Sequence, residues 1–274
     1  MQFIGQEENL KIINTWKYLP NFIIIQGDAH TGKTYLTLQI CKLFKLHYVE
    51  IGNTAKEVRN LIDVMKLNSN TLYHFKNFET ASLEAKNALL KITEEPIPGN
   101  YIVITGGPQI KTLQSRARII LMAPYSEADM CQYIEPIYPN PKLQLKLIHA
   151  GINTPAKLYY YKEYAHIESL LNFAYEVFNK ITYLSPEYII SMLSRFEDKY
   201  DEGIDACMLF LIMLINIIED NIKTKGYYSY EPILNILLMG KKLLSKEDTL
   251  RRKMLLFRIF YNIYELGVIQ NEKP

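Results

Sequence analysis

The chain has 274 residues, more than the roughly 100 to 200 of a typical single domain, so two or three compact units are expected. Apolar residues make up 49% and charged residues 22%, which is ordinary for a folded globular protein and argues against a disordered one. The formal net charge of +2 argues against a protein that holds nucleic acid by bulk electrostatics, although a local basic face is compatible with that total.

The three cysteines and the first residues of the chain indicate the cellular compartment in which the protein is expected. Cys41, Cys131 and Cys207 lie far apart without paired spacing, so neither a disulfide framework nor a zinc cluster is predicted. The first residues, MQFIGQEENLK, carry acidic side chains where a secretory signal needs a positive and then an apolar segment, so we expect a cytoplasmic protein. The most apolar run, 208–218, is shorter than the roughly 20 residues of a membrane span. It predicts a buried helix, and no membrane partner is expected.

From residue 21 to about residue 123, short apolar runs alternate with stretches of helical spacing, a pattern typical of α/β folds with a largely parallel sheet. Runs rich in β-branched and aromatic residues predict five strands, at 22–26, 47–51, 71–75, 101–105 and 117–122. Helices are predicted between them at 33–44, 55–65 and 81–94, the last ending where proline forbids continuation.

After Pro124 the strand pattern stops. Short helical segments separated by the turn sequences YPNP and INTP predict a small helical lid, and from residue 166 only helical spacing remains. We therefore predict three parts: an α/β domain over 1–123, a lid over 124–165 and an all-helical domain over 166–274. In the last part helices are predicted at 169–181, 186–196, 203–222, 232–244 and 248–266.

The segment GDAHTGKT, residues 27–34, matches the phosphate-binding pattern G-x-x-x-x-G-K-[ST] and lies between a predicted strand and a predicted helix. Gly27 and Gly32 permit backbone angles that turn N–H groups toward phosphate oxygens, and the helix that follows adds its positive dipole end. Lys33 is predicted to reach the β- and γ-phosphates, and the Thr34 hydroxyl to ligate Mg²⁺. The segment therefore predicts a site for ATP or ADP with Mg²⁺.

Two more polar residues lie inside this loop. Thr31 precedes the second glycine and is included among the predicted nucleotide-binding residues. His30 occupies a variable position of the pattern, so we expect its side chain to point into solvent rather than to act in catalysis.

Four segments, met in chain order, carry a family resemblance: Gly5-Gln6, residues 27–34, residues 84–96 and Ser115-Arg116. The segment EAKNALLKITEEP is similar to the helix A-x-N-A-L-L-K-x-L-E-E-P of the AAA+ clamp-loader subunits. The chain resembles most the delta-prime and gamma/tau subunits of bacterial DNA polymerase III. The resemblance covers residues 1 to about 165, and extends to the helical remainder only by position and class.

This resemblance implies an AAA+ core, a helical lid and a collar-like oligomerisation domain. It places Gly5 and Gln6 beside an adenine pocket, and makes Lys157 a lid residue that senses bound nucleotide. It implies that Arg116 is an arginine finger that acts on the nucleotide of a neighbouring subunit, whereas a surface salt bridge is the alternative for this residue. The implied partners are other AAA+ subunits in a ring, together with a sliding clamp and primed DNA.

The sequence departs from the family where catalytic acids are expected. Two acidic residues should follow the strand at 71–75, one to support Mg²⁺ and one to activate water, but Lys76 and Asn77 occupy these positions. A charged lysine cannot ligate a cation, and asparagine cannot accept a proton from water, so hydrolysis should be severely impaired. Glu79 is a possible substitute, but the alignment assigns it to the next segment.

Two more departures concern the rest of the core. Gly106-Gly107 follow the strand at 101–105, where the family carries a polar residue that orients the attacking water. The four-cysteine zinc module of the family is absent, so no zinc is expected.

These observations favour a clamp-loader-like subunit in DNA replication that binds ATP with impaired hydrolysis and offers its arginine finger to a neighbour. Whether the chain is itself an enzyme is left open. One alternative is an autonomous AAA+ ATPase remodeller with a carboxylate from Glu79, or from Glu94 and Glu95. The other is a scaffold or DNA-binding subunit that acts without nucleotide.

Overall fold

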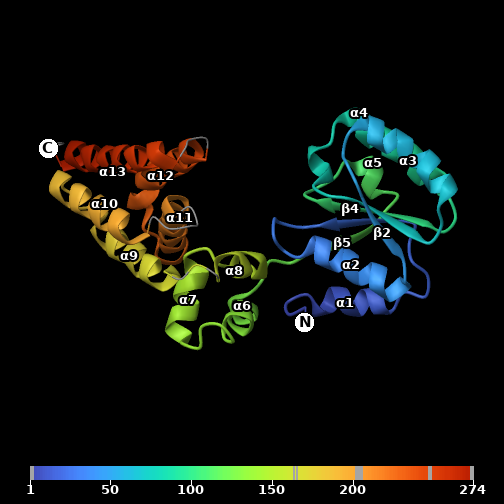
Figure 1. The fold of residues 1–274 in the computed structure, drawn as a ribbon, viewed down its shortest axis with the longest axis horizontal. Helices are drawn as coiled ribbons and strands as arrows, with labels where there is room; N and C mark the ends of the chain where they lie inside the picture. Colours follow the sequence, from blue (N-terminus) through green and yellow to red (C-terminus); the bar gives the residue numbers. More distant parts are fainter. Residues whose placement is uncertain (1–2, 163, 165, 201–205, 246–248, 272–274) are drawn as a thin grey trace. The chain divides into compact units, whose positions relative to one another are not determined.

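The computed structural model describes residues 3–162, 164, 166–200, 206–245 and 249–271, and it divides into two compact units (Figure 1). The first unit is Met1–Asp129 with Thr154–Ala156, and the second is Met130–Asn153 with Lys157–Pro274. The finer predicted division into a lid over 124–165 and a collar-like domain over 166–274 stays a prediction.

A five-stranded parallel sheet with the order β2-β3-β4-β1-β5 forms the centre of the first unit. The strands are β1 Phe22–Gln26, β2 His47–Ile51, β3 Thr71–Phe75, β4 Asn100–Gly106 and β5 Arg118–Leu121. All five predicted strands are thereby confirmed, with β4 extended at both ends and β5 shortened. Because every pair is parallel, the segments that follow β1, β3, β4 and β5 emerge at one edge of the sheet.

Helices cover both faces of this sheet (Figure 1). They are α1 Glu7–Asn14, α2 Lys33–Phe44, α3 Ala55–Leu67, α4 Leu83–Glu94 and α5 Lys111–Gln114, with a 3-10 turn, η1, at Phe78–Thr80. Figure 1 shows α1 and α2 on one face and α3, α4 and α5 on the other.

The strand side chains alternate between two apolar cores. Phe22 and Ile24 of β1 pack into the core with α3 and α4, whereas Ile23 and Ile25 pack into the core with α1 and α2. All four are buried, and a fully buried side chain of this size contributes about 1.5 to 3 kcal/mol. The unbroken apolar run of β1 therefore fits a strand covered on both faces.

Local caps fix the helices next to the site. Thr54 and Glu57 form a capping box at the start of α3, and the Ser82 hydroxyl accepts a bond from the Ala85 N–H at the start of α4. Gly32 precedes α2 in the left-handed region, with φ +93°. The caps of α3 and α4 satisfy backbone N–H groups that would otherwise have no partner at the helix start. Gly32 permits the left-handed turn that leads into α2.

The chain after β5 is helical throughout the part that the structure describes. The helices are α6 Glu127–Ile134, α7 Pro141–His149, α8 Pro155–Tyr161, α9 Ile167–Lys180, α10 Pro186–Tyr200, α11 Ala206–Lys225, η2 Tyr228–Tyr230, α12 Glu231–Leu244 and α13 Thr249–Asn271. This confirms the all-helical character predicted for the C-terminal region. The predicted starts of two helices, at residues 203 and 248, lie outside the described residues.

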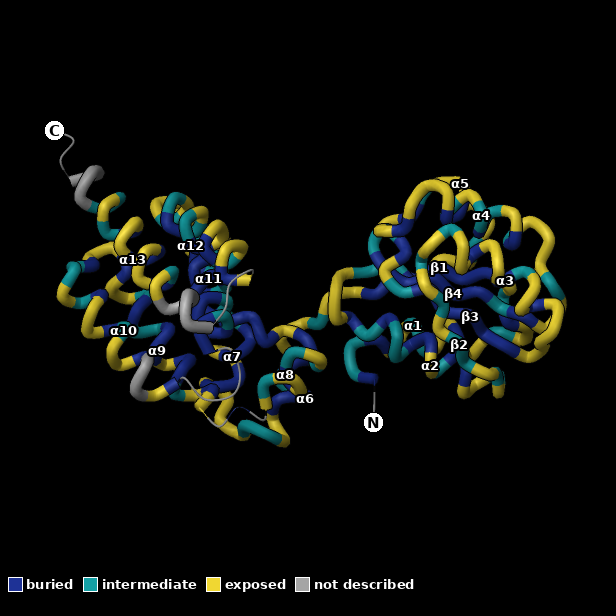
Figure 2. Tube along the Cα trace, turned by 45° about the horizontal axis from the view of Figure 1, so that its top comes forward, coloured by how far each residue is buried: buried dark blue, intermediate teal, exposed yellow. Residues whose placement is uncertain are grey.

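Helix α11 is largely buried, as the dark stretches of its tube in Figure 2 show. Of its 20 residues 11 are buried, and α9 and α12 pack along it. The apolar run 208–218 therefore lies in a buried helix, as predicted. Among the described residues, no helix is long and apolar enough to cross a membrane.

Candidate nucleotide-binding site

The loop 27–32 leaves the sheet at the end of β1 and leads directly into α2. Gly27 N–H donates to the Gly106 carbonyl over 3.0 Å, so the start of the loop is fixed to the end of β4. The loop then turns through two left-handed residues, His30 at φ +65° and Gly32 at φ +93°. The His30 side chain is exposed, as predicted. The strand, loop and helix thus have the arrangement that phosphate binding requires.

Both glycines of the loop are closely packed, and Gly32 also has a positive φ. A Cβ on Gly32 would lie 2.8 Å from the Phe3 ring, and a Cβ on Gly27 would lie 2.8 Å from Met122 Cβ. The positive φ of Gly32 adds backbone strain for any other residue. The tight packing against Phe3 and Met122 therefore also requires glycine at these positions.

Lys33 is buried, and its ammonium lies against the loop itself. The ammonium donates to the Gly27 carbonyl over 2.8 Å and also to the Asp28 carbonyl. Burial lowers the pKa of the Lys33 ammonium, and the carboxylates of Glu79 and then Asp28 oppose that shift. A phosphate group that binds Lys33 therefore competes with the carbonyls of the loop for the ammonium.

The two threonines of the pattern have different surroundings. Thr31 is buried, and its hydroxyl donates to the Asp28 carbonyl over 2.9 Å, while Tyr125 OH donates to the Thr31 carbonyl. Thr31 thereby stabilises the turn of the loop. Thr34 lies half-buried on the first turn of α2, one residue after Lys33. Its role as a ligand of Mg²⁺ stays a prediction.

Gly5 and Gln6 lie where the N-terminal segment meets the chain after β5. The buried Gln6 amide donates to the Ala123 carbonyl over 2.7 Å, and its oxygen accepts a bond from Asn9. Gly5 has φ +80°, and a Cβ there would lie 3.0 Å from the Asp129 carboxyl group. These contacts give both residues a structural role, and their predicted place beside an adenine stays a prediction.

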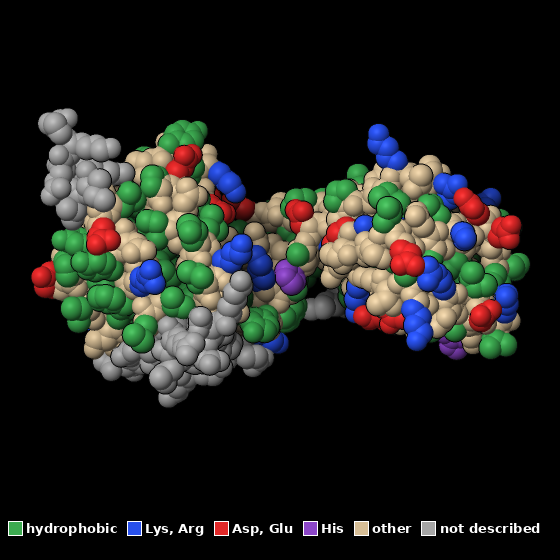
Figure 3. Space-filling view, turned by 90° about the horizontal axis from the view of Figure 1, so that it is seen from above, with side chains coloured by type: hydrophobic (Ala, Val, Ile, Leu, Met, Phe, Trp, Pro, Cys, Tyr) green, Lys and Arg blue, Asp and Glu red, His purple; other side chains and the backbone are tan. Residues whose placement is uncertain are grey.

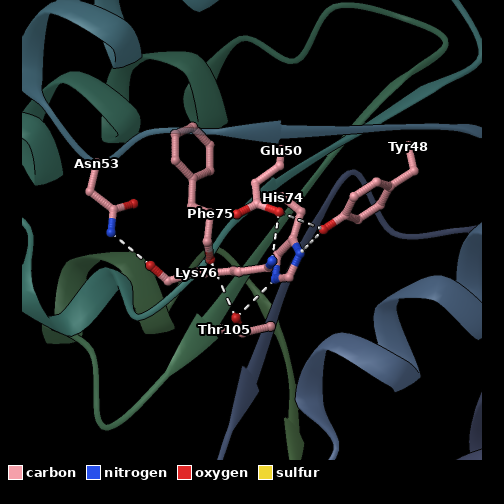
Figure 4. Close-up of polar contacts among 7 residues, drawn as sticks. All are labelled: Tyr48, Glu50, Asn53, His74, Phe75, Lys76 and Thr105. Carbon is pink, nitrogen blue, oxygen red and sulfur yellow. Dashed lines mark hydrogen bonds and ion pairs between the residues drawn. The ribbon is translucent and has the colours of Figure 1, made fainter.

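The two residues that follow β3 are not oriented as ligands for a cation. The Lys76 ammonium pairs with Glu50 Oε2 of β2 over 2.6 Å, and the Lys76 carbonyl accepts a bond from the Asn53 amide (Figure 4). Asn77 is exposed and left-handed, with φ +51°, and its carbonyl accepts bonds from the N–H and hydroxyl of Thr80. Where both acidic groups are missing, Lys76 and Asn77 thus make contacts with neighbouring protein groups at the end of β3.

A buried polar chain lies beneath this strand end (Figure 4). The His74 ring is fully buried, with Nδ1 2.8 Å from Tyr48 OH and Nε2 2.9 Å from Thr105 Oγ1. Burial, with a further effect of Lys76, lowers the pKa of His74 to about 4, against a smaller opposing effect of Glu50. His74 is therefore neutral at pH 7, and it links β2, β3 and β4 by hydrogen bonds.

Glu79 is the carboxylate that the structure brings to this edge of the sheet. A Cβ on Gly106 would collide with Glu79 Oε2, and a Cβ on Gly107 would lie 3.6 Å from Glu79 Cγ. Sequence alignment assigned Glu79 to the next segment, but η1 returns its side chain over β4. The glycine pair at the end of β4 was the available signal, because it leaves the space that this carboxylate fills.

Arg116 follows α5 and lies at the surface of the first unit. Its guanidinium donates to Glu94 Oε1 over 2.8 Å and to the Thr112 carbonyl over 2.9 Å. The pair with Glu94 is the surface salt bridge that the sequence left open as an alternative. An exposed pair of this kind contributes about 0 to 1 kcal/mol, so it does not prevent Arg116 from binding another partner.

Lys157 belongs to the second unit. Its ammonium donates to the Gly151 carbonyl and to Asn153 Oδ1, each over 2.9 Å. Burial lowers the pKa of the Lys157 ammonium, and Lys241 adds a smaller effect in the same direction. A role in sensing nucleotide stays a prediction.

The residues of the first unit fit a nucleoside triphosphate with Mg²⁺. Lys33 and the N–H groups of the loop would hold phosphate oxygens, and Thr34 would ligate the cation, which neutralises charge on the β- and γ-phosphates. Glu79 Oε2 is buried and makes no hydrogen bond within the described part of the chain. No group of three or more His, Cys, Asp or Glu among the described residues could hold a metal ion.

Comparisons with known proteins bear on the fold. No family model matches the chain, and no curated protein sequence matches it. A solved gamma-subunit-related protein of DNA polymerase III from Thermotoga maritima is 15% identical, with 96% of this chain and 99% of that chain covered at a TM-score of 0.47. A point variant of RuvB from Thermotoga maritima is 12% identical, with 83% and 84% covered at a TM-score of 0.50.

The same organism's RuvB, described as a Holliday junction branch migration motor, matches at 12% identity and a TM-score of 0.49, over 83% and 84% of the two chains. The match to the point variant shows the fold alone. Together with the parallel sheet and the helical C-terminal region, it confirms the AAA+ fold that the sequence motifs predicted. The protein therefore has an AAA+ type P-loop core followed by helices.

Proposed function

We propose that this protein is a clamp-loader-like AAA+ subunit of DNA replication that binds ATP, hydrolyses it poorly, and offers Arg116 to a neighbouring subunit. The observation that carries the proposal is the contrast at one sheet edge between an ordered phosphate loop and a strand end where Lys76 is paired with Glu50. A site with the first feature and without catalytic acids at the second is suited to hold nucleotide rather than to consume it.

The poor hydrolysis follows from the chemistry after β3. Activation of water needs a base in hydrogen-bond reach of the γ-phosphate side, and neither the Lys76 ammonium nor the Asn77 amide can accept a proton. Thr105 at the end of β4 is polar, but its hydroxyl lies 2.9 Å from the buried His74 ring. It is thus engaged inside the sheet. ATP would instead stabilise one arrangement of the subunit that its partners detect.

The role in trans depends on the exposed position of Arg116. A guanidinium that approaches the γ-phosphate of a neighbour stabilises the charge that develops during transfer. Releasing Arg116 from Glu94 costs about 1 kcal/mol or less, because the pair is exposed to solvent. Contact with a bound triphosphate would offset that cost.

The helical unit supports the expected ring assembly with other AAA+ subunits. On the face drawn in Figure 3, apolar side chains gather over the helical unit, whereas charges of both signs are mixed over the α/β unit. Met239 and Leu243 of α12 line a hollow of about 250 Å³ together with Ile259 of α13, and Met239 is 69% exposed. Apolar surface of this kind is expected to be covered by a neighbouring subunit. A sliding clamp and primed DNA are the proposed further partners.

Two measurements on the purified chain test the proposal. Equilibrium titration with the fluorescent analogue mant-ATP should show saturable binding that Lys33→Ala abolishes. Steady-state phosphate release by the wild-type chain alone should stay near background. His30→Ala is the matched control, since this exposed side chain lies in the same loop and should leave binding unchanged.

A different outcome would favour one of the alternatives. Robust phosphate release by the chain alone, lost in Lys33→Ala, would indicate an autonomous ATPase remodeller, and the position of Glu79 is the observation that keeps this candidate open. An absence of mant-ATP binding would indicate a scaffold or DNA-binding subunit that acts without nucleotide. Co-purification of sister AAA+ subunits and a sliding clamp would support the replication role directly.

A further inference from the structure

The backbone of Glu79 is firmly fixed after β3. The Glu79 carbonyl accepts a bond from the Lys86 ammonium over 2.7 Å, and the Asn77 carbonyl is bound by the Thr80 N–H and hydroxyl. Phe78, the neighbour of Glu79, is fully buried against Phe75. The 3-10 turn therefore fixes the direction in which the Glu79 side chain leaves the backbone, without any help from its carboxylate.

The carboxylate lies over the end of β4 and next to the phosphate loop. Gly106, with φ +150°, has no side chain to exclude it, and the Gly106 carbonyl accepts the bond from Gly27 N–H at the start of the loop. Glu79 is also the carboxylate that most strongly opposes the effect of burial on the pKa of Lys33. The contact with the end of β4 thus places the Glu79 carboxylate near the phosphate loop, and its effect on the pKa of Lys33 agrees with that position.

One oxygen of the Glu79 carboxylate can accept a further bond. Glu79 Oε2 is buried and makes no hydrogen bond within the residues that the structure describes. A buried carboxylate oxygen without a partner costs free energy unless a cation, water or a donor binds it. A hard divalent cation such as Mg²⁺ is a suitable partner because it prefers carboxylate oxygens and retains several water molecules.

We propose that Glu79 takes over the support of nucleotide-bound Mg²⁺ that the residues directly after β3 cannot give. The carboxylate would hold the cation or its water ligands, with Thr34 as the direct protein ligand and the phosphates as the remaining ones. This inference rests on the proposed nucleotide binding, and it assigns no proton transfer to Glu79. It explains how the chain can retain a metal-dependent nucleotide site although Lys76 is paired with Glu50.

The test uses the full chain and mant-ATP, titrated with Mg²⁺ and, separately, in EDTA. For the wild type, Mg²⁺ should tighten mant-ATP binding. Glu79→Gln keeps the shape of the side chain, removes its charge and should weaken the apparent Mg²⁺ affinity of the complex about 10- to 100-fold, as loss of a supporting carboxylate does in metal sites. Binding in EDTA should be retained by this variant and lost in Lys33→Ala.

The control is Glu84→Gln, because Glu84 is an exposed carboxylate at the start of α4 that pairs with Arg59. It should leave the Mg²⁺ titration unchanged. Unfolding followed by Trp16, the only tryptophan of the chain, verifies that the first unit of each variant is folded.

Several results would overturn the inference. If Glu79→Gln shows the wild-type Mg²⁺ titration, Glu79 does not support the cation, while the proposed nucleotide binding stands. If the wild type does release phosphate and Glu79→Gln abolishes that release with an unchanged Mg²⁺ titration, Glu79 acts as a base instead. A wild-type chain that binds no mant-ATP contradicts the proposed function and this inference together.

Discussion

The ends of β1 and β3 lie at the same edge of one sheet, but different groups hold the chain in place after each strand. After β1, the loop is held mainly through its backbone groups: Gly32 has a positive φ, Gly27 N–H is bonded to β4, and the loop carbonyls accept bonds from the Lys33 ammonium. After β3, the structure is defined by side chains, with Lys76 paired to Glu50 over 2.6 Å.

The two strand ends therefore differ in which changes of sequence they can accept. A cradle made of N–H groups requires a particular backbone path, and the packing of Gly32 against Phe3 fixes that path. Acidic side chains after a strand can be replaced without moving the strand, provided that the new groups find partners. Lys76 finds one in Glu50, and the buried His74 secures the strand from below.

The largest effect is expected from Gly32→Ala at the end of β1. The new Cβ would meet the Phe3 ring at 2.8 Å in a residue with φ +93°, so we expect the first unit to lose about 2 to 4 kcal/mol. Urea unfolding followed by Trp16 fluorescence measures this unit, because Trp16 packs against its core. Gly99→Ala, at φ +78° with no atom closer than 3.4 Å, should lose less. Equal losses would show that the contact with Phe3 is unimportant.

The buried histidine beneath β3 should make the first unit sensitive to acid. The pKa of His74 is about 4 in the folded chain and about 6.5 in the unfolded one, so between these values only the unfolded state takes up the proton. The stabilisation is present above pH 6.5 and is lost as pH falls through 4, an effect of about 3 kcal/mol on the free energy of unfolding. Trp16-monitored urea unfolding at pH 7, 5 and 4 gives this slope.

Replacing His74 by Gln should remove this part of the pH dependence. The control is His47→Gln, which removes an exposed histidine of the adjacent strand and should leave the slope as in the wild type. If both variants retain the same slope, His74 is not the group responsible, and other groups cause the acid sensitivity.

A smaller effect is expected at Asn77, which adopts the left-handed region with φ +51°. Asparagine tolerates this conformation better than other residues with a side chain. Asn77→Ala should therefore destabilise the first unit by about 1 kcal/mol, whereas Asn77→Gly should remain within about 0.5 kcal/mol of the wild type. Chemical unfolding of the two variants side by side provides the comparison, and a stable alanine variant would contradict the expected strain.

The smallest effect is expected from Lys76→Met, which breaks the pair with Glu50. Both side chains are substantially exposed, so the change in unfolding free energy at pH 7 should be below about 1 kcal/mol. Because Lys76 contributes to the low pKa of His74, its removal should also reduce the acid sensitivity. Mant-ATP binding should stay unchanged, and a large loss of binding would show that the strand end takes part in holding nucleotide.

The sequence alone determined the fold class, the strands and the phosphate loop. Short apolar runs such as 22–26 and 71–75 reflect burial on both faces of a sheet, and this pattern is local in the chain. The spacing of Gly27, Gly32 and Lys33 is also local, since one short loop supplies all these groups. The absence of an acidic pair after β3 could be found for the same reason.

Only the tertiary structure decided which groups meet at the sheet edge. Glu79 reaches the site because a turn after β3 directs it over Gly106 at the end of β4, and no local pattern encodes that contact. The partners of Lys76 and Arg116, namely Glu50 and Glu94, likewise lie on other elements. Side-chain pairing between distant segments depends on how strands and helices are placed. The sequence could therefore name the missing acids and offer Glu79 as a possible substitute, but it could not show that the Glu79 carboxylate lies over Gly106.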